Sequence, residues 1–573
     1  MKLTELLEKN RELESSLKEK EPYTIALLSN ITISQIEPYI EFELRNLGVN
    51  AKAISANYDT ILQDAEIYKD KSCLIIFWEL TNIIDGFQHR IELLSNSESE
   101  ALILRVKSWI DHLFDTLRSS KLVIMNQFSA MLFTAHIPAR TKAEEIGTLL
   151  NSYIRERKPD NFSLVDLDKI ISQISVNESF NTRDYYSSKI LYSSRFYKEY
   201  AEHIRPILKA SLGLAKKALI LDCDNTIWGG IAGEDGISGI KISGEDSTGR
   251  IFKEVQNFIL KLKNSGVLLC LCSKNNSSDV EEIFSKLEMP LTYDDFVIKK
   301  INWDDKAKNI SQIADELNIG LDSIVFVDDS EFEINRVKSV LEDVTVALVP
   351  KDLSKYPQFM TKLSCDFFST NGTEEDLLRS KFYLEEAKRK DLKSSFESIE
   401  SFLRSLELRI RFYKNKPDIL PRMAQLTQKT NQFNLTTRRY TEAELTTMLY
   451  SSEWLMYAFE SGDRLGSSGI TGLSLIKIDS NIAQIDTFLM SCRVIGRNFE
   501  FAFFDSVIED ISKLGISNLL AEYIPTKKNS QVENFYDNLG FSNNGSKSQS
   551  TLYQISLKEY KPRHLDYIMV EYE

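Results

Sequence analysis

The sequence predicts a multidomain α/β protein, and three observations lead to that prediction. The chain has 573 residues, and single hydrophobic cores stop growing at roughly 250 to 300 residues, so several domains are expected. Hydrophobic residues make up 42% and charged residues 27% of the chain, as in ordinary globular proteins. Short apolar runs alternate with helical patterns over most of residues 1–372. This alternation predicts parallel, doubly wound sheets.

We expect three domains, at residues 1–212, 213–372 and 373–573. In the first, apolar runs predict strands at 23–28, 73–77 and 122–125, with an amphipathic helix near 34–47. In the second, we expect strands at 218–222, 267–272 and 324–328, with helices near 249–264, 278–287 and 305–318.

The third predicted domain begins with a highly charged stretch, residues 373–398, which is typical of a solvated helical connector. Beyond it the pattern is mixed α+β. We expect strands at 406–413, 454–459, 471–477, 482–490 and 518–523, with helices at 418–429, 498–514 and 529–538.

Composition excludes several classes of partner. The net charge of −14 argues against a general affinity for nucleic acid or anionic membranes. Charges are spread through Met1–Lys9, and no apolar run approaches the length of about 20 residues that a membrane span needs. The six cysteines lie mostly in apolar runs without metal-type spacing, which indicates reduced thiols. We therefore expect a cytoplasmic protein with no nucleic-acid or membrane partner.

The end of the predicted strand at 218–222 is the most informative part of the sequence. The apolar run Ala218–Leu221 leads directly into Asp222-Cys223-Asp224-Asn225-Thr226, which places two carboxylates at the carboxyl edge of a sheet, where open α/β folds bind ligands. A carboxylate such as Asp222 can accept a phosphoryl group, and Asp224 can protonate the leaving oxygen and later deprotonate water. A lone Asp-x-Asp-x-Thr is also common as a turn or helix cap.

Further polar positions fall where other predicted strands end or helices begin, and they are Ser273, Lys306, Asp328 and Asp329. Together with the first acidic pair, their order resembles the haloacid dehalogenase (HAD) superfamily of aspartate-nucleophile phosphatases, whose catalytic domain has a Rossmann-like sheet. The resemblance implies that Ser273 donates to a phosphoryl oxygen and that Lys306 neutralises the nucleophile and the transferring group. It also implies a Mg²⁺ ion, held by Asp222, the backbone carbonyl of Asp224, Asp328 and Asp329.

Two short intervals predict an open site. Only about two dozen residues separate Thr226 from the helix near 249, and about thirty separate Ser273 from Lys306. Both intervals are shorter than a small independent domain. We therefore expect no large cap over the phosphoryl site.

Two segments of the third domain resemble the GNAT acetyltransferase fold. Arg493-Val494-Ile495-Gly496-Arg497-Asn498 is similar to the loop in which backbone N–H groups at a helix start bind a pyrophosphate, although Asn498 replaces a small residue. Asn529–Phe541 is similar to the region whose tyrosine, here Tyr536, often serves as a general acid. The resemblance implies contacts with coenzyme A or phosphopantetheine through Arg493, Gly496, Asn498 and Tyr536. The alternative for Tyr536 is packing in the core.

Two other regions allow structural and functional interpretations. The polar run 425–440 is either a solvated loop or a groove lined by Gln428, Asn431, Asn434 and Arg438.

The first domain is weakly similar to SGNH hydrolases, with Ser29 after its first strand. It lacks the Gly-Asp before that serine and an Asp-x-x-His, so Ser29 has no evident base. We expect a non-catalytic role for this domain; Asn82 and Asn126 either contact ligand or form turns.

Three segments together, residues 220–230, 425–440 and 491–497, resemble the FkbH-like family, which joins a HAD domain of subfamily IIIC to a GNAT-like domain. The resemblance implies an enzyme that transfers a glyceryl unit from 1,3-bisphosphoglycerate, a phosphorylated three-carbon substrate, to the phosphopantetheine thiol of an acyl carrier protein, with loss of phosphate. The alternatives are a stand-alone phosphatase of small phosphorylated metabolites and a non-catalytic carrier-protein docking module.

Overall fold

The computed structural model describes residues 3–573 except 85, 243, 245, 369–388, 390–391, 393–395, 397, 527 and 548–549. Contacts divide the chain into two compact units, one of Met1–Ser211 with Tyr440–Leu445 and one of Leu212–Arg439 with Thr446–Glu573. The predicted division into three domains stays a prediction. Most of the charged stretch 373–398, predicted to be a helical connector, lies outside the described residues.

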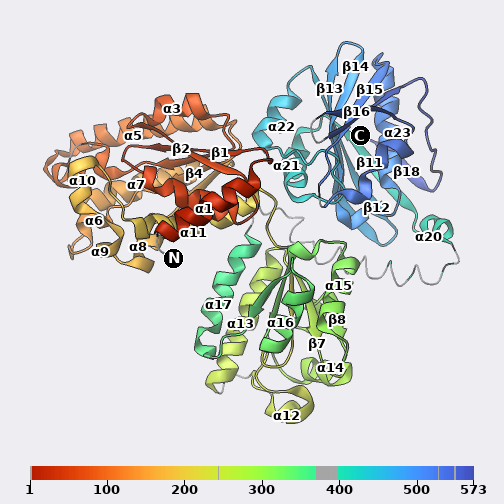
Figure 1. Ribbon diagram of the computed structural model, residues 1–573, viewed down its shortest axis with the longest axis horizontal. Coiled ribbons are helices and arrows are strands. Elements are labelled where there is room, and N and C mark those ends of the chain that lie inside the picture. Colours follow the sequence, from red (N-terminus) through yellow and green to blue (C-terminus); the bar gives the residue numbers. More distant parts are fainter. Residues whose placement is uncertain are drawn as a thin grey trace. The chain divides into compact units, whose positions relative to one another are not determined.

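The first unit contains a five-stranded parallel sheet in the order β2-β1-β3-β4-β5 (Figure 1). Its strands are β1 (Tyr23–Ser29), β2 (Ala51–Tyr58), β3 (Cys73–Phe77), β4 (Val123–Asn126) and β5 (Phe162–Val165). The predicted strands that correspond to β1, β3 and β4 are confirmed. We did not predict β2, where few side chains are buried, or the short β5.

Helices pack on this sheet because alternate strand residues point to opposite faces. Ala26, Leu28 and Leu74 share a buried cluster with residues of α3, α5 and α7. The predicted amphipathic helix near 34–47 is a 3₁₀ turn, Ser34–Ile36, followed by α2. The helices are α1 (Leu3–Leu17), α2 (Glu37–Arg45), α3 (Ile61–Tyr68), α4 (Phe87–Arg90), α5 (Asn96–Leu117), α6 (Met131–Thr134), α7 (Lys142–Arg157), α8 (Leu167–Ile174), α9 (Val176–Ser179), α10 (Thr182–Ser188) and α11 (Ser194–Ser211).

The second unit begins with another five-stranded parallel sheet, in the order β10-β9-β6-β7-β8. Its strands are β6 (Ala218–Leu221), β7 (Leu268–Ser273), β8 (Ile298–Ile301), β9 (Ile324–Asp328) and β10 (Thr345–Leu348). Its helices are α12 (Ala232–Gly239), α13 (Ser247–Asn264), α14 (Ser277–Lys286), α15 (Lys306–Leu317), α16 (Glu331–Val340) and α17 (Tyr356–Leu363). The three strands and three helices predicted for this region are confirmed to within about two residues.

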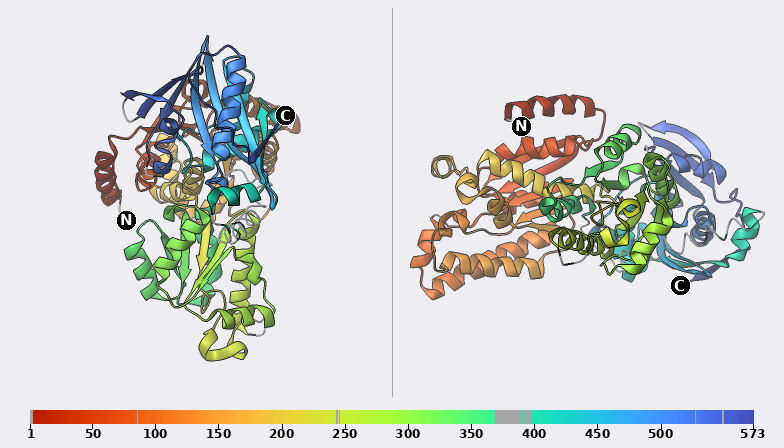
Figure 2. Two further views of the ribbon diagram at one scale, coloured as in Figure 1. Left: turned by 90° about the vertical axis from the view of Figure 1, so that its right-hand side faces the viewer. Right: turned by 90° about the horizontal axis from the view of Figure 1, so that it is seen from below.

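Both faces of this central sheet are covered by helices (Figures 1 and 2). Leu219 and Leu221 pack with α13 and α17, whereas Ala218 and Ile220 pack with α15 and α16. The chain runs from β6 outward through β7 and β8, and then returns to β9 on the other side of β6. Strand order therefore reverses between β6 and β9, and doubly wound sheets bind ligands at the carboxyl ends of strands at such a point.

The rest of the second unit contains an eight-stranded mixed sheet in the order β16-β17-β15-β14-β13-β12-β11-β18. Its strands are β11 (Leu408–Lys414), β12 (Trp454–Asp463), β13 (Gly466–Asp479), β14 (Ile482–Met490), β15 (Asn518–Tyr523), β16 (Ser542–Lys547), β17 (Ser550–Ser556) and β18 (Ile568–Tyr572). Its helices are α20 (Ile399–Ser405), α21 (Leu420–Lys429), α22 (Glu442–Leu449), α23 (Phe499–Lys513) and α24 (Phe535–Asn538). The mixed α+β pattern is confirmed.

The neighbouring strands β14 and β15 are parallel and pair only where Ile482–Gln484 meets Asn518–Leu520. The predicted helix at 529–538 is broken into a 3₁₀ turn, Ser530–Val532, and the short α24.

Within the part of the chain that the structure describes, no helix combines the length and the apolar character needed to cross a membrane.

Candidate active site

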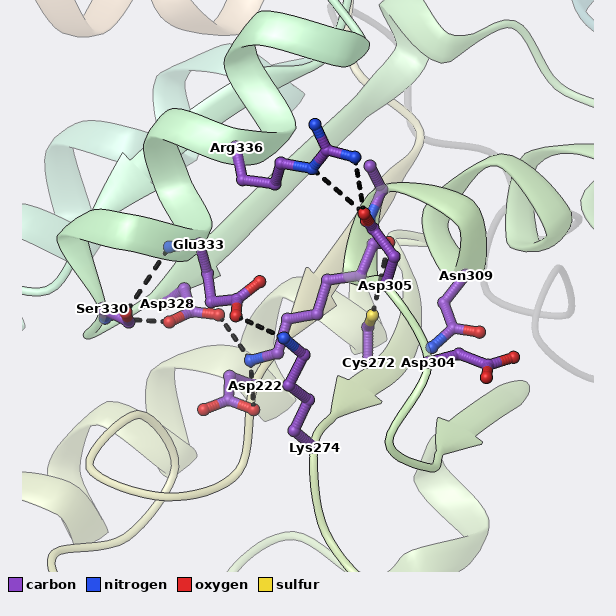
Figure 3. A network of polar contacts seen from close by, with 12 residues as sticks. Asp222, Cys272, Lys274, Asp304, Asp305, Asn309, Asp328, Ser330, Glu333 and Arg336 are labelled. Carbon is purple, nitrogen blue, oxygen red and sulfur yellow. Dashed lines mark hydrogen bonds and ion pairs between the residues drawn. The ribbon is translucent and has the colours of Figure 1, made fainter.

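Side chains from three segments meet at the carboxyl edge of the central sheet. Asp222 follows β6, Asp328 ends β9, and Lys306 is the first residue of α15. The ammonium nitrogen of Lys306 lies 2.8 Å from Asp222 Oδ1 and 2.7 Å from Asp328 Oδ2. The two aspartates lie close together at this edge (Figure 3). All three side chains are buried. The structure therefore brings together three of the residues that the sequence motifs single out.

The charges of this cluster do not balance. Burial alone would lower the pKa of Lys306, but Asp222 and Asp328 raise it above its usual range, so the ammonium stays charged. Burial and the nearby Asp222 raise the pKa of Asp328 to about 7, and the same two causes raise the pKa of Asp329. One ammonium faces three carboxyl groups, and an additional cation would stabilise their ionised forms.

The acidic residues fit a magnesium ion. Asp222, Asp328 and Asp329 each offer a carboxylate oxygen, and these oxygens lie within 4.8 Å of one another. Asp222 Oδ1 is buried, and its contact with Lys306 leaves other lone pairs of this carboxylate available to a metal ion. Carboxylate oxygens are hard ligands of the kind that Mg²⁺ prefers. The proposed contribution of the Asp224 backbone carbonyl stays a prediction.

The position of Lys306 is fixed by the start of its helix. Asp305 caps α15 by accepting a hydrogen bond from the backbone N–H of Ala307 at 2.8 Å. Arg336 of α16 donates two hydrogen bonds to Asp305 Oδ2, at 3.0 and 2.8 Å (Figure 3). Since two N–H donors converge on one carboxylate oxygen, they restrain the Asp305 side chain that caps the helix, and α15 presents Lys306 to the two aspartates.

Asp224 is half-buried and held by three N–H donors. Its Oδ1 accepts from Trp228 Nε1 at 3.0 Å and from the backbone N–H of Ala232 at 3.1 Å, and its Oδ2 accepts from Asn275 Nδ2 at 3.0 Å. Asn225 between the two aspartates adopts a left-handed backbone conformation, with φ 52°. This turn leads the chain away from β6 just beyond the acidic pair.

Ser273 ends β7 and is buried, and its Oγ accepts from Asn275 Nδ2 at 3.2 Å. Asn275 thus contacts both Ser273 and Asp224, although sequence reasoning did not single it out. Its only signal is a polar side chain two residues beyond a strand end. Cys223 between the aspartates is fully buried, and burial raises the pKa of its thiol, so it is not a competing thiolate nucleophile.

The described residues around the site contain no cap domain. Between Asp224 and α13 they form the eight-residue α12, and between Ser273 and Lys306 they form α14 and β8. These insertions are far smaller than a domain, and the open site stays a prediction.

The predicted pyrophosphate loop lies before α23, a helix of 15 residues. Gly496 and Asn498 have positive φ, 84° and 63°, but Asn498 donates to Tyr567 Oη at 2.7 Å, and Arg493 donates to Ser491 Oγ at 3.3 Å. In the first turn of α23, burial raises the pKa of Glu500 to about 7. A carboxyl group at a helix start occupies the favoured place of an anion, and coenzyme A contacts stay a prediction.

Tyr536 is fully buried, and burial raises the pKa of its hydroxyl. The ring packs against Phe535, Phe541 and Tyr553, with ring centroids 5.6, 5.1 and 5.3 Å away. In this structure Tyr536 therefore packs in the core, and its hydroxyl is not exposed to a ligand.

The polar run 425–440 begins in α21, and its residues 433–435 pair with the eight-stranded sheet. The backbone N–H of Leu435 donates to Phe488 O at 3.2 Å, and its carbonyl accepts from Ile524 N at 2.8 Å. Phe433 O accepts from Met490 N at 3.0 Å. Residues 433–435 therefore fill the gap where β14 and β15 separate, and Asn434 is fully buried there. Asn434 has a structural role, and so has Arg438, which pairs with Asp486 and Glu522.

In the first unit, the predicted contact residues hydrogen-bond within the protein. Ser29 Oγ accepts from Ile31 N at 3.0 Å, and Asn82 Nδ2 donates to Asn30 O at 2.6 Å. Asn126 donates to Glu79 Oε1 at 3.3 Å and accepts from Tyr200 Oη at 3.0 Å. These contacts agree with turn and packing roles.

No protein-family model matches the sequence, and no curated protein is significantly similar to it. Among solved structures, the N-terminal part of the protein BF1531 from Bacteroides fragilis, which contains a phosphatase domain and is complexed with Mg, is similar with a TM-score of 0.54 and 26% sequence identity. The similarity covers 63% of this chain and 99% of that one. This chain is therefore a mixed α/β protein with a part similar to a phosphatase domain.

Two acetyltransferase structures are similar to smaller parts of the chain. The ribosomal-protein-S18-alanine N-acetyltransferase from Escherichia coli has a TM-score of 0.21 and 11% identity, covering 27% of this chain and 98% of that one. The PaiA N-acetyltransferase from Thermoplasma acidophilum, in complex with coenzyme A, has a TM-score of 0.18 and 16% identity, covering 20% and 72%. Similarities this low support no functional argument. The FkbH-like and SGNH-like resemblances stay predictions.

Proposed function

We propose that this protein is a Mg²⁺-dependent phosphatase with Asp222 as its nucleophile. The observation that carries the proposal is the buried contact of Lys306 with both Asp222 and Asp328, where strand order reverses in a parallel sheet. The similarity to the Mg-complexed phosphatase-containing part of BF1531 supports it. Asp329 beside this cluster completes a donor set that fits Mg²⁺.

The reaction would proceed in two displacements. A carboxylate oxygen of Asp222 attacks phosphorus, the bond between phosphorus and the leaving oxygen breaks, and Asp224 donates a proton to that oxygen. A water molecule then attacks the phosphorus of the aspartyl-phosphate while Asp224 accepts its proton. Inorganic phosphate leaves and Asp222 is regenerated. Ser273 donates a hydrogen bond to a phosphoryl oxygen, and Lys306 offsets the negative charge of the nucleophile and of the transferring group.

When bound by Asp222, Asp328 and Asp329, Mg²⁺ would supply positive charge that offsets the repulsion between the carboxylates and the phosphate. The protein's own part is to hold these carboxylates together before the substrate arrives. Burial and the Lys306 contacts provide that arrangement.

Phosphate release from a panel of phosphate monoesters, with MgCl₂ or with EDTA, tests the proposal. We expect Mg²⁺-dependent release by the wild type and a loss of roughly 10⁴-fold or more in Asp222→Asn, because nucleophile removal abolishes the covalent route. Asp343→Asn is the matched control, because Asp343 is exposed and precedes β10 at the opposite edge of the sheet. Equal release by wild type and Asp222→Asn would defeat the proposal.

A narrower proposal concerns the acceptor. The resemblance to the FkbH-like family supports transfer of a glyceryl unit from 1,3-bisphosphoglycerate to an acyl carrier protein, with pantetheine contacts in the C-terminal part of the chain. Mass spectrometry of a carrier protein after incubation with enzyme and 1,3-bisphosphoglycerate tests it. A glyceryl mass gain supports transfer. Phosphate release without a mass gain supports the stand-alone phosphatase. If the protein binds the carrier but causes neither a mass gain nor phosphate release, the result supports the docking module.

A further inference from the structure

Asn275 lies between the two groups that would handle the proton and the phosphoryl oxygens. It follows β7 by two residues and is 5% exposed. Its Nδ2 donates to Asp224 Oδ2 at 3.0 Å and to Ser273 Oγ at 3.2 Å. An amide NH₂ group has two hydrogens, and both are used, one on each partner.

These two hydrogen bonds determine which way the neighbouring protons point. Because Ser273 Oγ accepts from Asn275, the single proton of its hydroxyl is left to be donated elsewhere. Asp224 receives a third N–H donor in addition to those of Trp228 and Ala232. Asn275 therefore aligns Ser273 as a donor and fixes the orientation of the Asp224 carboxyl group.

The segment that carries Asn275 is itself anchored on both sides. The preceding Lys274 reaches Glu333 Oε1 of α16 at 2.7 Å (Figure 3). The following Asn276 accepts from Trp303 Nε1 at 3.1 Å and donates to Asp279 Oδ2 at 3.0 Å. Since neighbouring side chains restrain the loop, Asn275 has few alternative positions, as precise orientation of an acid–base group requires.

We propose that Asn275 is a positioning residue for phosphoryl transfer, which couples the orientation of the acid–base residue Asp224 to that of the phosphate-binding Ser273. The inference rests on the proposed phosphatase function. It predicts two separable effects of removing the amide. Loss of the Asp224 contact weakens proton donation to the leaving oxygen, whereas loss of the Ser273 contact weakens binding of the phosphoryl group of any substrate.

The test compares two aryl esters of similar shape, phenyl phosphate and dinitrophenyl phosphate, on wild type, Asn275→Ala and Asn275→Asp with saturating MgCl₂. Phenolate is a poor leaving group that needs a proton, whereas dinitrophenolate leaves without one. The quantity measured is kcat/KM, which reports the first displacement. For each variant we compare the ratio between the two esters, because that ratio does not depend on the fraction of folded enzyme.

For Asn275→Ala we expect kcat/KM to fall about 10- to 100-fold on phenyl phosphate, which is part of the roughly 10²- to 10⁴-fold that general acid catalysis contributes in full. On dinitrophenyl phosphate we expect a fall of roughly threefold at most, through KM rather than kcat, from the loss of phosphate orientation. Asn275→Asp, which replaces the donor by an acceptor, should change the ratio in the same direction. Asn264→Ala is the matched control, because Asn264 is an exposed asparagine at the end of α13, which precedes β7 at the opposite edge of the sheet.

An unchanged ratio in Asn275→Ala would overturn the positioning role, whether kcat/KM falls equally on both esters or on neither. The same conclusion follows if Asn264→Ala shifts the ratio as much as Asn275→Ala. A wild type inactive on both esters would instead refute the proposed phosphatase function. The two failures are therefore distinguishable.

Discussion

The two five-stranded parallel sheets of this protein have polar side chains at corresponding edges but very different charge. At the edge of the central sheet, Asp222, Asp328 and Asp329 face a single cation, Lys306. At the corresponding edge of the first sheet, the carboxyl group of Glu79, just beyond β3, contacts a neutral amide, that of Asn126. The fold places polar groups at both edges, but among the described residues only the central edge holds three carboxylates close enough to share a metal ion.

At the end of β3, the edge of the first sheet is closed by hydrogen bonds between uncharged groups. Asn30 accepts from the backbone N–H of Glu79 at 2.8 Å and donates to its carbonyl at 2.9 Å. Glu79 is almost fully buried, and burial raises the pKa of its side chain to about 7. Such an arrangement stabilises a protonated acid and offers no free charge to a ligand.

Among the changes that test this comparison, replacing Lys306, the cation shared by Asp222 and Asp328, should have the largest effect on stability and on phosphate release. In Lys306→Met, two buried carboxylates lose their partner, which costs about 3–5 kcal/mol of unfolding free energy and about 10²- to 10³-fold in phosphate release. Urea denaturation with EDTA and phosphate assays with MgCl₂ measure the two losses. We expect Mg²⁺ to restore part of the stability.

The control for this variant is Lys308→Met, since Lys308 is an exposed lysine of the same helix. It should change neither quantity appreciably. If Lys306→Met releases phosphate at a rate close to that of the wild type, the central edge does not depend on its cation and the contrast with the first sheet is wrong.

Glu79→Gln is expected to have an intermediate effect, on pH dependence. The pKa of Glu79 rises from 4.5 to about 7 on folding, so the folded state binds more protons between these values. Its contribution to stability is therefore present below about pH 4.5 and is lost as the pH rises through about 7. Glutamine does not titrate. The unfolding free energy of the wild type should fall relative to that of Glu79→Gln by about 3 kcal/mol between these limits.

Urea denaturation of both proteins at acidic and slightly alkaline pH measures this difference. The exposed Glu100→Gln in α5 serves as control and should show no pH-dependent difference. Phosphate release should be equal in wild type and Glu79→Gln. A pH-independent difference for Glu79→Gln would mean that folding does not raise the pKa of this carboxyl group, and that the end of β3 does not hold a protonated acid.

Ser29→Ala should have the smallest effect. It removes one hydrogen bond, from Ile31 N, and we expect a cost of about 1 kcal/mol in unfolding free energy. Hydrolysis of phosphate and carboxylate esters should be unchanged, measured in parallel with wild type. Loss of ester hydrolysis in this variant would show that the first sheet carries a catalytic serine.

Local sequence predicted the acidic cluster well because each member marks the end of a strand or the start of a helix. Asp222, Lys306 and Asp328 follow from apolar runs and their boundaries, which are visible in the sequence. Asn275 was missed because its role depends on which side chains meet across the sheet edge. A single asparagine after a strand otherwise indicates only a turn.

Elements with weak patterns were harder to predict. In β2 only Ala51 and Ala53 are buried, and two small residues do not produce a strand-like apolar run. The burial of Tyr536 and the insertion of residues 433–435 between β14 and β15 depend on tertiary packing and strand register. Neither is encoded in a local period of hydrophobicity.

The insertion of residues 433–435 also affects how the eight-stranded sheet unfolds. Backbone hydrogen bonds link this segment to β14 on one side and to Ile524, just after β15, on the other. The amides of Leu435, Met490 and Ile524 should therefore exchange with deuterium as slowly as those inside the strands, since exposing them requires opening the sheet itself. A segment that a sequence-based view assigns to a polar loop thus belongs to the cooperative unfolding unit.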